Sequence, residues 1–429
     1  MFSIKDRIRK EIEEKLMLRF KHWCLNIVLL ILSVISILVV AEVITRLVYP
    51  YPTEYELRYC LRTDDNAGYD LPENFAPRWY RIKGYKYKIW TNELGCFDIP
   101  YNGEKNYILL VGDSFIWGFS AFEHKCGTVM EKHLGYRVLK CGVTAYGTKQ
   151  ELIKAKKIIE KTKNPPKLII VGYCVPHDCI DDFLFPQYAI IDGYFVRKIN
   201  VDKLTGDKKI VPESECKEKI KELNKCPSAS AIEKIKWWVR KRSVLYKIIR
   251  TNNIVRLIGV KLGLFNKPPP FQPYETLFKI EKYPWLKEAW EENLKNLKEF
   301  KELANKYGAK LLIVLIPTRE EVYDFLRRPG DYDWEGANKM ISGLLKEEGM
   351  GYLDLTPLFR KYANPKPREE LNSKDFYWQE DGHWNIRGNR LAGLLIAKYV
   401  IEHGLIEITD RDNKKTWIEE EISKFSINQ

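Results

Sequence analysis

Residues 106–119, NYILLVGDSFIWGF, join an unbroken apolar run to a short polar turn. The run from Ile108 to Val111 does not alternate apolar and polar residues, which predicts a strand covered on both faces, as in a parallel sheet between helices. The run stops at Gly112-Asp113-Ser114. Because sites in such sheets are built at the carboxyl ends of the strands, Ser114 stands where a nucleophile could stand.

Apolar runs typical of strands alternate with amphipathic helical patterns along the rest of the chain. The expected strands are YILLVG (107–112), YRVLKCG (136–142), KLIIVGYCV (167–175), AKLLIVLIP (309–317) and GYLDL (351–355). Helical patterns occupy residues 127–133, 149–162, 285–307, 334–346 and 385–403. Strands separated by helices require crossover connections and therefore a parallel sheet. We predict an α/β fold with three α/β/α layers and roughly five parallel strands.

The N-terminal region contains a long apolar segment. Residues 23–41, WCLNIVLLILSVISILVVA, run 19 positions without a charge, close to the roughly 20 that span a bilayer as a helix. The 22 residues before it carry seven Lys and Arg, whereas Arg46 stands alone just after it. The positive-inside rule therefore predicts a cytoplasmic N-terminus and an extracytoplasmic domain. A cleaved signal peptide is the alternative, with a cleavage site at Val39-Val40-Ala41.

These patterns divide the chain into segments. We expect a basic cytoplasmic segment (1–22), a transmembrane anchor (23–41), a lead-in (42–105), the α/β domain (106–405, with an insertion at 186–284) and a C-terminal tail (406–429). The lead-in is expected to lie against the domain, with a short strand at Tyr85, Tyr87 and Ile89. In the insertion, IKWWVRKR (235–242) is interpreted as a helix over the core or the site rim, with the membrane interface as the alternative. Trp237, Trp238, Trp285 and Trp290 could stack on sugar rings, but core packing is the simpler expectation.

The distribution of charged residues does not indicate a nucleic-acid partner. Lys and Arg outnumber Asp and Glu by 71 to 58, but opposite charges are interleaved in stretches such as NLKNLKEFKE (293–302). This interleaving is typical of solvated helix faces rather than a phosphate-binding stripe. Asp181 and Asp182 are expected in a solvated loop. We predict no nucleic-acid partner.

Nine cysteines are present, and all but Cys24 follow the apolar segment. An even number in an exported region permits disulfides. Cys216 with Cys226 would close a short charged segment. Alternatively, Cys174 and Cys179 pair with each other or are small buried residues. The spacings of Cys and His do not match a metal site, and we expect no cofactor.

A serine nucleophile needs a base and a group that orients the base. Of six histidines, His383 is the best candidate because it lies in YWQEDGHWNIRG, just before the last predicted helix. Asp381 can reach the far nitrogen of its ring, and Glu380 is the competitor. Considered without the other motifs, Ser114 could equally be a small residue that a tight turn favours rather than a nucleophile.

These motifs together resemble those of the SGNH, or GDSL, hydrolase superfamily. The resemblance rests on Gly112-Asp113-Ser114, on Gly142 after the next strand and on DGHWN (381–385). With TNELGCFD (91–98), the chain resembles the membrane-anchored branch that includes surface polysaccharide O-acetylation proteins.

The resemblance implies Ser114 as nucleophile, His383 as general base and Asp381 as its orienting partner. It also implies an oxyanion hole from the N–H groups of Ser114 and Gly142 and an Asn side chain. The third family motif usually ends in Asn-Asp, but His177-Asp178 stands here. A neutral imidazole can donate one N–H and could replace that amide. Equally, His177 could be a loop residue bonded to Asp178 or Asp181.

The expected function is acyl-ester chemistry on a surface glycan, by hydrolysis or by O-acyl transfer. The two reactions share one acyl-enzyme, so the triad does not distinguish them. A transferase would need an acyl donor, delivered by a membrane partner. The alternative from another class is a catalytically reduced glycan-binding or scaffold protein on the same fold.

Overall fold

A computed structural model describes most of the chain. The described residues are 4–48, 60–82, 85–175, 177–202, 204–224, 230–246, 277, 283–327, 330, 332–366, 371–372, 374–379 and 382–426. The chain forms two compact units, one of residues 1–51 and 224–270 and the other of residues 52–223 and 271–429. The second unit contains the predicted α/β domain.

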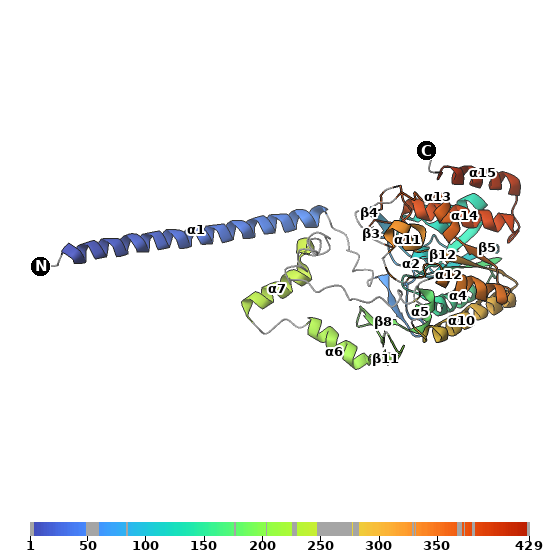
Figure 1. The fold of residues 1–429 in the computed structure, drawn as a ribbon, viewed down its shortest axis with the longest axis horizontal. Helices are drawn as coiled ribbons and strands as arrows, with labels where there is room; N and C mark the ends of the chain where they lie inside the picture. Colours follow the sequence, from blue (N-terminus) through green and yellow to red (C-terminus); the bar gives the residue numbers. More distant parts are fainter. Residues whose placement is uncertain are drawn as a thin grey trace. The chain divides into compact units, whose positions relative to one another are not determined.

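A five-stranded parallel sheet forms the centre of this domain (Figure 1). Its strands are β5 (Tyr107–Gly112), β6 (Arg137–Lys140), β7 (Leu168–Cys174), β12 (Lys310–Ile316) and β13 (Tyr352–Asp354). Their spatial order is β13-β12-β7-β5-β6, and every pairing is parallel. The chain moves from β5 to one side and then returns to its other side at β7. The end of β5 is therefore a topological switch point, where α/β sheets open a crevice.

Helices cover both faces of the sheet, as predicted (Figure 1). Leu109 and Val111 of β5 join the hydrophobic core on one face, and Ile108 and Leu110 join the core on the other. The first core is closed by α4 (Thr148–Thr162), α10 (Leu286–Tyr307) and α12 (Gly336–Glu347). The second is closed by α3 (Cys126–Leu134), α13 (Thr356–Tyr362), α14 (Ile386–Glu402) and α15 (Arg411–Ser423). The predicted fold class is confirmed.

Smaller elements surround the sheet. Four antiparallel pairs are β1 (Arg62–Asp64) with β2 (Gly68–Asp70), β3 (Arg78–Ile82) with β4 (Tyr85–Ile89), β8 (Tyr188–Ile191) with β9 (Tyr194–Arg197), and β10 (Ile199–Val201) with β11 (Lys208–Ile210). Short helices are α2 (Ser114–Trp117), α5 (Asp178–Phe183) and α11 (Arg319–Val322), with 3-10 turns at Phe122–His124 and Asp324–Leu326. The insertion begins with β8–β11 and continues with α6 (Glu213–Asn224) and α7 (Ala231–Arg242).

The lead-in packs against the domain through buried polar contacts. The ammonium of Lys154 on α4 forms a buried ion pair with Asp70 at 2.7 Å and donates to the Gly95 carbonyl at 2.9 Å. The Tyr69 hydroxyl donates to the Ala145 carbonyl at 2.6 Å, and the Tyr146 hydroxyl donates back to Tyr69. The strand expected at Tyr85–Ile89 is β4. These contacts hold the lead-in beside the segment that follows β6.

The N-terminal apolar segment lies within α1 (Ile4–Val48). Its stretch Lys15–Leu47 is long and apolar enough to cross a membrane, and none of its most apolar window is buried. By length and composition, α1 is a candidate membrane anchor or signal sequence.

One disulfide joins the lead-in to the sheet. Cys96 and Cys141 are bonded, and 45 residues separate them in sequence. The predicted pairing of Cys174 with Cys179 is wrong, because both are free, buried thiols at the end of β7 and in α5. Cys216 is also a free thiol, and Cys226 lies outside the described residues. Sequence spacing suggested disulfides between cysteines close in the chain, whereas the observed bond joins residues 45 positions apart.

Loss of this disulfide should destabilise the domain. We expect the double variant Cys96→Ala/Cys141→Ala to lose about 2–5 kcal/mol of unfolding free energy, because closing a long loop restricts the unfolded chain. Urea unfolding followed by tryptophan fluorescence measures the loss. Wild type in reducing agent should match the variant, and equal midpoints for oxidised and reduced wild type would contradict the prediction.

Candidate active site

The turn after β5 is built on glycines. Ile116 of α2 packs over the ends of three adjacent strands, where a Cβ on Gly112, Gly142 or Gly172 would approach Ile116 atoms to within 2.2–2.8 Å. A Cβ on Gly142 would also lie 2.4 Å from the Trp117 nitrogen. Larger residues would therefore push α2 away from the sheet. The glycines allow α2 to begin directly at the strand end, with Ser114 as its first residue.

Asp113 starts this helix. Its Oδ1 accepts a hydrogen bond from the Phe115 N–H at 2.8 Å, as an N-cap residue does. Its Oδ2 lies 3.3 Å from Ser114 Oγ, which donates to it. Asp113 thus fixes the turn by capping α2.

Ser114 and His383 meet although 269 residues separate them. His383 Nε2 lies 2.7 Å from Ser114 Oγ, within the reach that a general base needs. The phenyl rings of Phe115 and Phe119 lie 5.2 Å and 4.4 Å from the imidazole. The predicted orienting acids, Asp381 and Glu380, lie outside the described residues. The geometry meets the requirement for a nucleophile and base, and their catalytic roles remain a prediction.

The segment around His383 is held by backbone and packing contacts. The Trp378 N–H donates to the His383 carbonyl at 3.0 Å, and Tyr377 forms a β-bridge with Trp384. The buried Trp384 ring lies 5.0 Å from Phe115. Asn385 caps α14 by accepting from the Gly388 N–H at 2.9 Å. Packing by Trp384 and helix initiation by Asn385 thus fix the loop that presents the histidine.

Asn389 joins the element that carries the histidine to the one that carries the serine. This fully buried α14 side chain donates to the Gly118 carbonyl at the end of α2, at 3.0 Å. It also donates to the carbonyls of Trp384 and Asn385, and its oxygen accepts from the Cys126 N–H of α3. Sequence reasoning missed this residue. A polar residue one helical turn after Asn385, within an apolar helix, was the available signal.

Two backbone amides at this end of the sheet, those of Gly142 and Ser114, have no acceptor in the described part of the chain. The N–H groups of Cys141 and Val143 donate to β5 carbonyls, at 2.9 Å and 3.0 Å, whereas the Gly142 N–H between them has no acceptor in the described part of the chain. The same holds for the Ser114 N–H. These are the two backbone donors predicted for the oxyanion hole. That role stays a prediction.

The TNELGCFD loop supports Gly142. Asn92 Oδ1 accepts from the N–H groups of Leu94 and Cys96, at 3.1 Å and 3.0 Å, which shapes the loop. Cys96 is bonded to Cys141, and Asp98 Oδ2 accepts from the Lys140 N–H at 3.0 Å. The loop is thus attached to the two residues that precede Gly142.

His177 lies at the start of α5, after β7. Its N–H donates to the Cys174 carbonyl at 2.9 Å, and its carbonyl accepts from the Asp181 N–H at 2.8 Å. Loss of solvent around the half-buried ring, together with the positive charge of His383, lowers the pKa of His177 to about 3. At neutral pH the ring is therefore neutral and has one N–H to donate. Whether it serves as the third oxyanion donor stays a prediction.

The acids that follow His177 are buried, so the expected solvated loop is wrong. Asp182 accepts from the Lys149 N–H at 2.7 Å and from the side-chain amides of Asn293 and Asn296, both at 2.8 Å. It therefore links α4, α5 and α10. Burial raises its pKa to about 7, although these hydrogen bonds oppose the shift. The tertiary contacts of α5, which is shorter than two turns, bury residues that sequence polarity placed in solvent.

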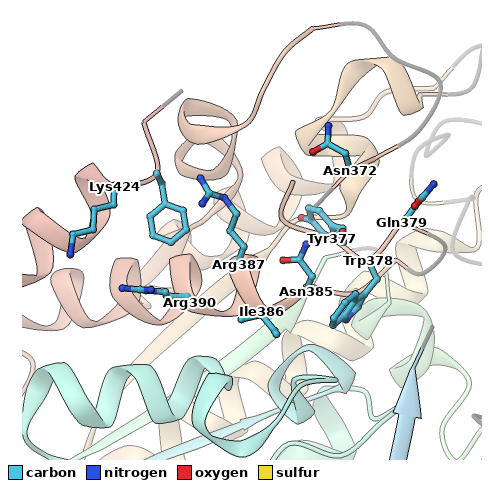
Figure 2. A pocket seen from close by; sticks show the side chains of 10 residues that line it. Asn372, Tyr377, Trp378, Gln379, Asn385, Ile386, Arg387, Arg390 and Lys424 are labelled. Carbon is cyan, nitrogen blue, oxygen red and sulfur yellow. Dashed lines mark hydrogen bonds between the residues drawn. The ribbon is translucent and has the colours of Figure 1, made fainter. Parts of the chain in front are cut away.

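A cavity of about 810 Å³ opens beside the histidine loop. Figure 2 shows Arg387 and Arg390 extending from α14 and Lys424 from the end of α15, with Trp378 and Gln379 on the loop before His383. The Arg387 guanidinium lies 4.6 Å from the Phe425 ring centre and pairs with no carboxylate among the described residues. By contrast, Arg390 pairs with Glu421. Among the described residues, the cavity thus offers a guanidinium without a carboxylate ion pair and an aromatic wall.

Comparison with known proteins identifies the domain. Residues 277–424 match the family model described as an SGNH hydrolase-like domain of the acetyltransferase AlgX. This match covers about a third of the chain and supports the SGNH hydrolase superfamily for the α/β domain. The matched residues contain the histidine segment and α14, while Ser114 and Gly142 precede them. No curated protein matches the chain significantly.

Solved structures similar to the chain share little sequence with it. A lipolytic G-D-S-L family protein assigned to Desulfitobacterium hafniense DCB-2 is 12% identical with a TM-score of 0.34, covering 68% of this chain and 98% of that one. An acetyl xylan esterase, AlAXEase, is 11% identical with a TM-score of 0.35, covering 68% and 99%. A GDSL-like lipase from Bacteroides thetaiotaomicron VPI-5482 is 11% identical with a TM-score of 0.30, covering 71% and 91%.

Removing the Asn389 side chain should loosen the contact between α14 and α2. We expect Asn389→Ala to lower the unfolding free energy by about 1–3 kcal/mol, because the buried Gly118 carbonyl loses its donor. The variant should also slow covalent labelling of Ser114 by a fluorophosphonate. Asn338→Ala is the matched control, since Asn338 is buried and bonds Thr356 between α12 and α13. Equal labelling by Asn389→Ala and wild type would contradict the positioning role.

Asp113 should make stability depend on pH. Burial raises its pKa from 3.8 to about 6, although the Phe115 N–H and the charge of His383 oppose the shift. Between about pH 4 and 6 the folded state therefore holds a proton that the unfolded state has released, so stability falls as pH rises. Asn caps as well as Asp but does not titrate.

We therefore expect the stability of Asp113→Asn relative to wild type to increase by about 1–3 kcal/mol between pH 4 and pH 8. Urea unfolding at both pH values measures the change. If the difference in unfolding free energy between wild type and Asp113→Asn is the same at pH 4 and at pH 8, the pKa of Asp113 is not raised and the prediction is wrong.

Proposed function

We propose that this chain is an exported, membrane-anchored esterase or O-acyltransferase that acts on acyl esters, in the first place acetyl esters, of surface glycans. The observation that carries the proposal is the 2.7 Å contact between His383 Nε2 and Ser114 Oγ at the switch point of the sheet. The match of residues 277–424 to an SGNH hydrolase-like domain supports ester chemistry in general, and the acetyltransferase in its description supports the acetyl group. The glycan follows from the sequence resemblance to surface polysaccharide O-acetylation proteins.

The residues present can perform each step of acyl transfer. Ser114 Oγ attacks the ester carbon while its proton passes to His383 Nε2. Negative charge then develops on the carbonyl oxygen, where the free N–H groups of Ser114 and Gly142, with His177 as third donor, would stabilise it. When the carbon–oxygen bond to the leaving alcohol breaks, His383 returns the proton to that alcohol, and the acyl group stays on Ser114.

The second half of the reaction repeats these steps with a new nucleophile. Water, deprotonated by His383, would release the acid and make the protein an esterase. A sugar hydroxyl would take the acyl group and make it a transferase. The cavity beside Trp378 and Arg387 is a suitable acceptor site, because aromatic and guanidinium groups contact sugar rings and their polar substituents. A transferase would receive its acyl group from a membrane-bound donor partner.

Export is supported by the character of the N-terminal region. Helix α1 contains a segment with the length and composition of a membrane span, and basic residues concentrate in its first part, before the apolar run 23–41. In the proposed arrangement, the N-terminus is cytoplasmic and the α/β domain is extracytoplasmic. The Cys96–Cys141 disulfide is consistent with an oxidising compartment.

The replacement of the family's Asn by His177 favours a second candidate, a glycan-binding or scaffold protein with reduced catalysis. Loss of one oxyanion donor typically costs about 100-fold to 1,000-fold in rate. In that case the cavity would bind sugar without turnover. The reactivity of Ser114 separates the two candidates.

Fluorophosphonate labelling of the purified chain tests the enzyme directly. We expect Ser114→Ala to abolish labelling and His383→Ala to slow it by at least about 100-fold, because an unactivated hydroxyl is a poor nucleophile. Ser120→Ala is the matched control, since Ser120 is buried, six residues away, and its hydroxyl has no partner in the described structure. A folded wild type that stays unlabelled, while it binds glycan, would favour the binding protein.

A further inference from the structure

Helix α7, in the compact unit that also contains α1, leaves large apolar side chains in solvent. Ile235 is 61% exposed and Trp238 is 55% exposed. They lie three residues apart and so on one face of the helix. Within its own compact unit, that face of α7 is therefore not covered. Trp285 and Trp290, in contrast, are buried in the core of the α/β domain.

The C-terminal end of α7 is attached to α1. Ser243, which follows α7 directly, donates its hydroxyl to the Glu42 carboxylate at 2.7 Å. The same carboxylate accepts from the N–H groups of Val244 and Leu245 at 2.9 Å and 3.0 Å. Glu42 is the first charged residue after the apolar run 23–41. One end of α7 is therefore fixed where the apolar part of α1 ends.

The composition of α7 matches a bilayer surface. Its twelve residues, AIEKIKWWVRKR, contain five basic residues and one acid. Interfacial helices combine Lys and Arg with Trp and large aliphatic residues, and basic residues favour anionic headgroups. A helix of this length extends about 18 Å. Trp238 lies within about 8 Å of Ser243 along the helix axis, so it stays near the level at which α1 would leave the membrane.

We propose that α7 lies in the headgroup layer of an anionic bilayer beside α1, with Ile235 and Trp238 inserted toward the acyl chains. The proposal rests on the membrane-anchoring part of the proposed function and not on its chemistry. The occupant of the apolar face is lipid rather than another protein, because Glu42 places the helix at the end of a membrane-length apolar segment and because the helix is strongly basic. The insertion would thus give the protein a second attachment to the membrane.

Quenching by brominated lipids tests this placement. The full chain is reconstituted into vesicles of phosphatidylcholine and phosphatidylglycerol, with dibromo lipids labelled at a shallow or a deep acyl position. The contribution of Trp238 is the difference in fluorescence between wild type and Trp238→Phe. Trp417→Phe supplies the matched control, since Trp417 of α15 is also exposed, at 38%, but lies in the α/β domain.

We expect shallow bromine to quench at least about half of the Trp238 contribution, deep bromine to quench less, and neither to quench Trp417. Replacing phosphatidylglycerol with phosphatidylcholine should weaken the quenching of Trp238.

Vesicle flotation distinguishes anchoring of the chain through α1 from insertion of α7. A chain that does not float overturns both the anchor and the proposal, whereas a floating chain with unquenched Trp238 overturns the proposal alone. Trp238 shielded from acrylamide but not quenched by bromine would identify a protein partner and also overturn it.

Discussion

The contact of Ile116 with the glycines at three strand ends determines the geometry of the site. Gly112, Gly142 and Gly172 lie on, or directly after, three neighbouring strands, and none could carry a Cβ without moving Ile116. Because α2 lies this close, Ser114 projects from the strand end itself rather than from a loop above it. The backbone of Gly142 is brought beside the same helix. Nucleophile and predicted oxyanion donor thus depend on one packing contact.

The rest of the domain holds the histidine segment against that helix. Asn389 connects α14 to the end of α2, and Trp384 packs on Phe115. On the other side, the lead-in reaches the site through the disulfide at Cys141. Segments from the lead-in, from the ends of β5 and β6 and from α14 therefore meet at one point. A site assembled in this way is pre-organised by the core and not by a flexible loop.

Buried acids occur in the segments that follow β5, β6 and β7. Asp113, Glu151, Asp178 and Asp182 are all buried, and burial raises the pKa of each. Mutual repulsion contributes to the shifts of Glu151 and Asp178, so their protonated forms are favoured.

The sequence by itself determined the parallel α/β fold, the order of its strands along the chain, the apolar N-terminal helix and the candidates Ser114 and His383, because these depend on local periodicity and short motifs. Only the tertiary structure decided that Cys96 bonds Cys141, that Asp182 is buried and that Asn389 links two helices. The same is true of Ile235 and Trp238, which the compact unit that contains α1 leaves uncovered. Each of these outcomes depends on residues far apart in the chain, and neither hydropathy nor spacing within one segment contains that information. The contact between Ser114 and His383 depends on both the sequence and the tertiary structure. Short motifs identified the two residues, and the sheet topology brings Ser114 Oγ within 2.7 Å of His383 Nε2.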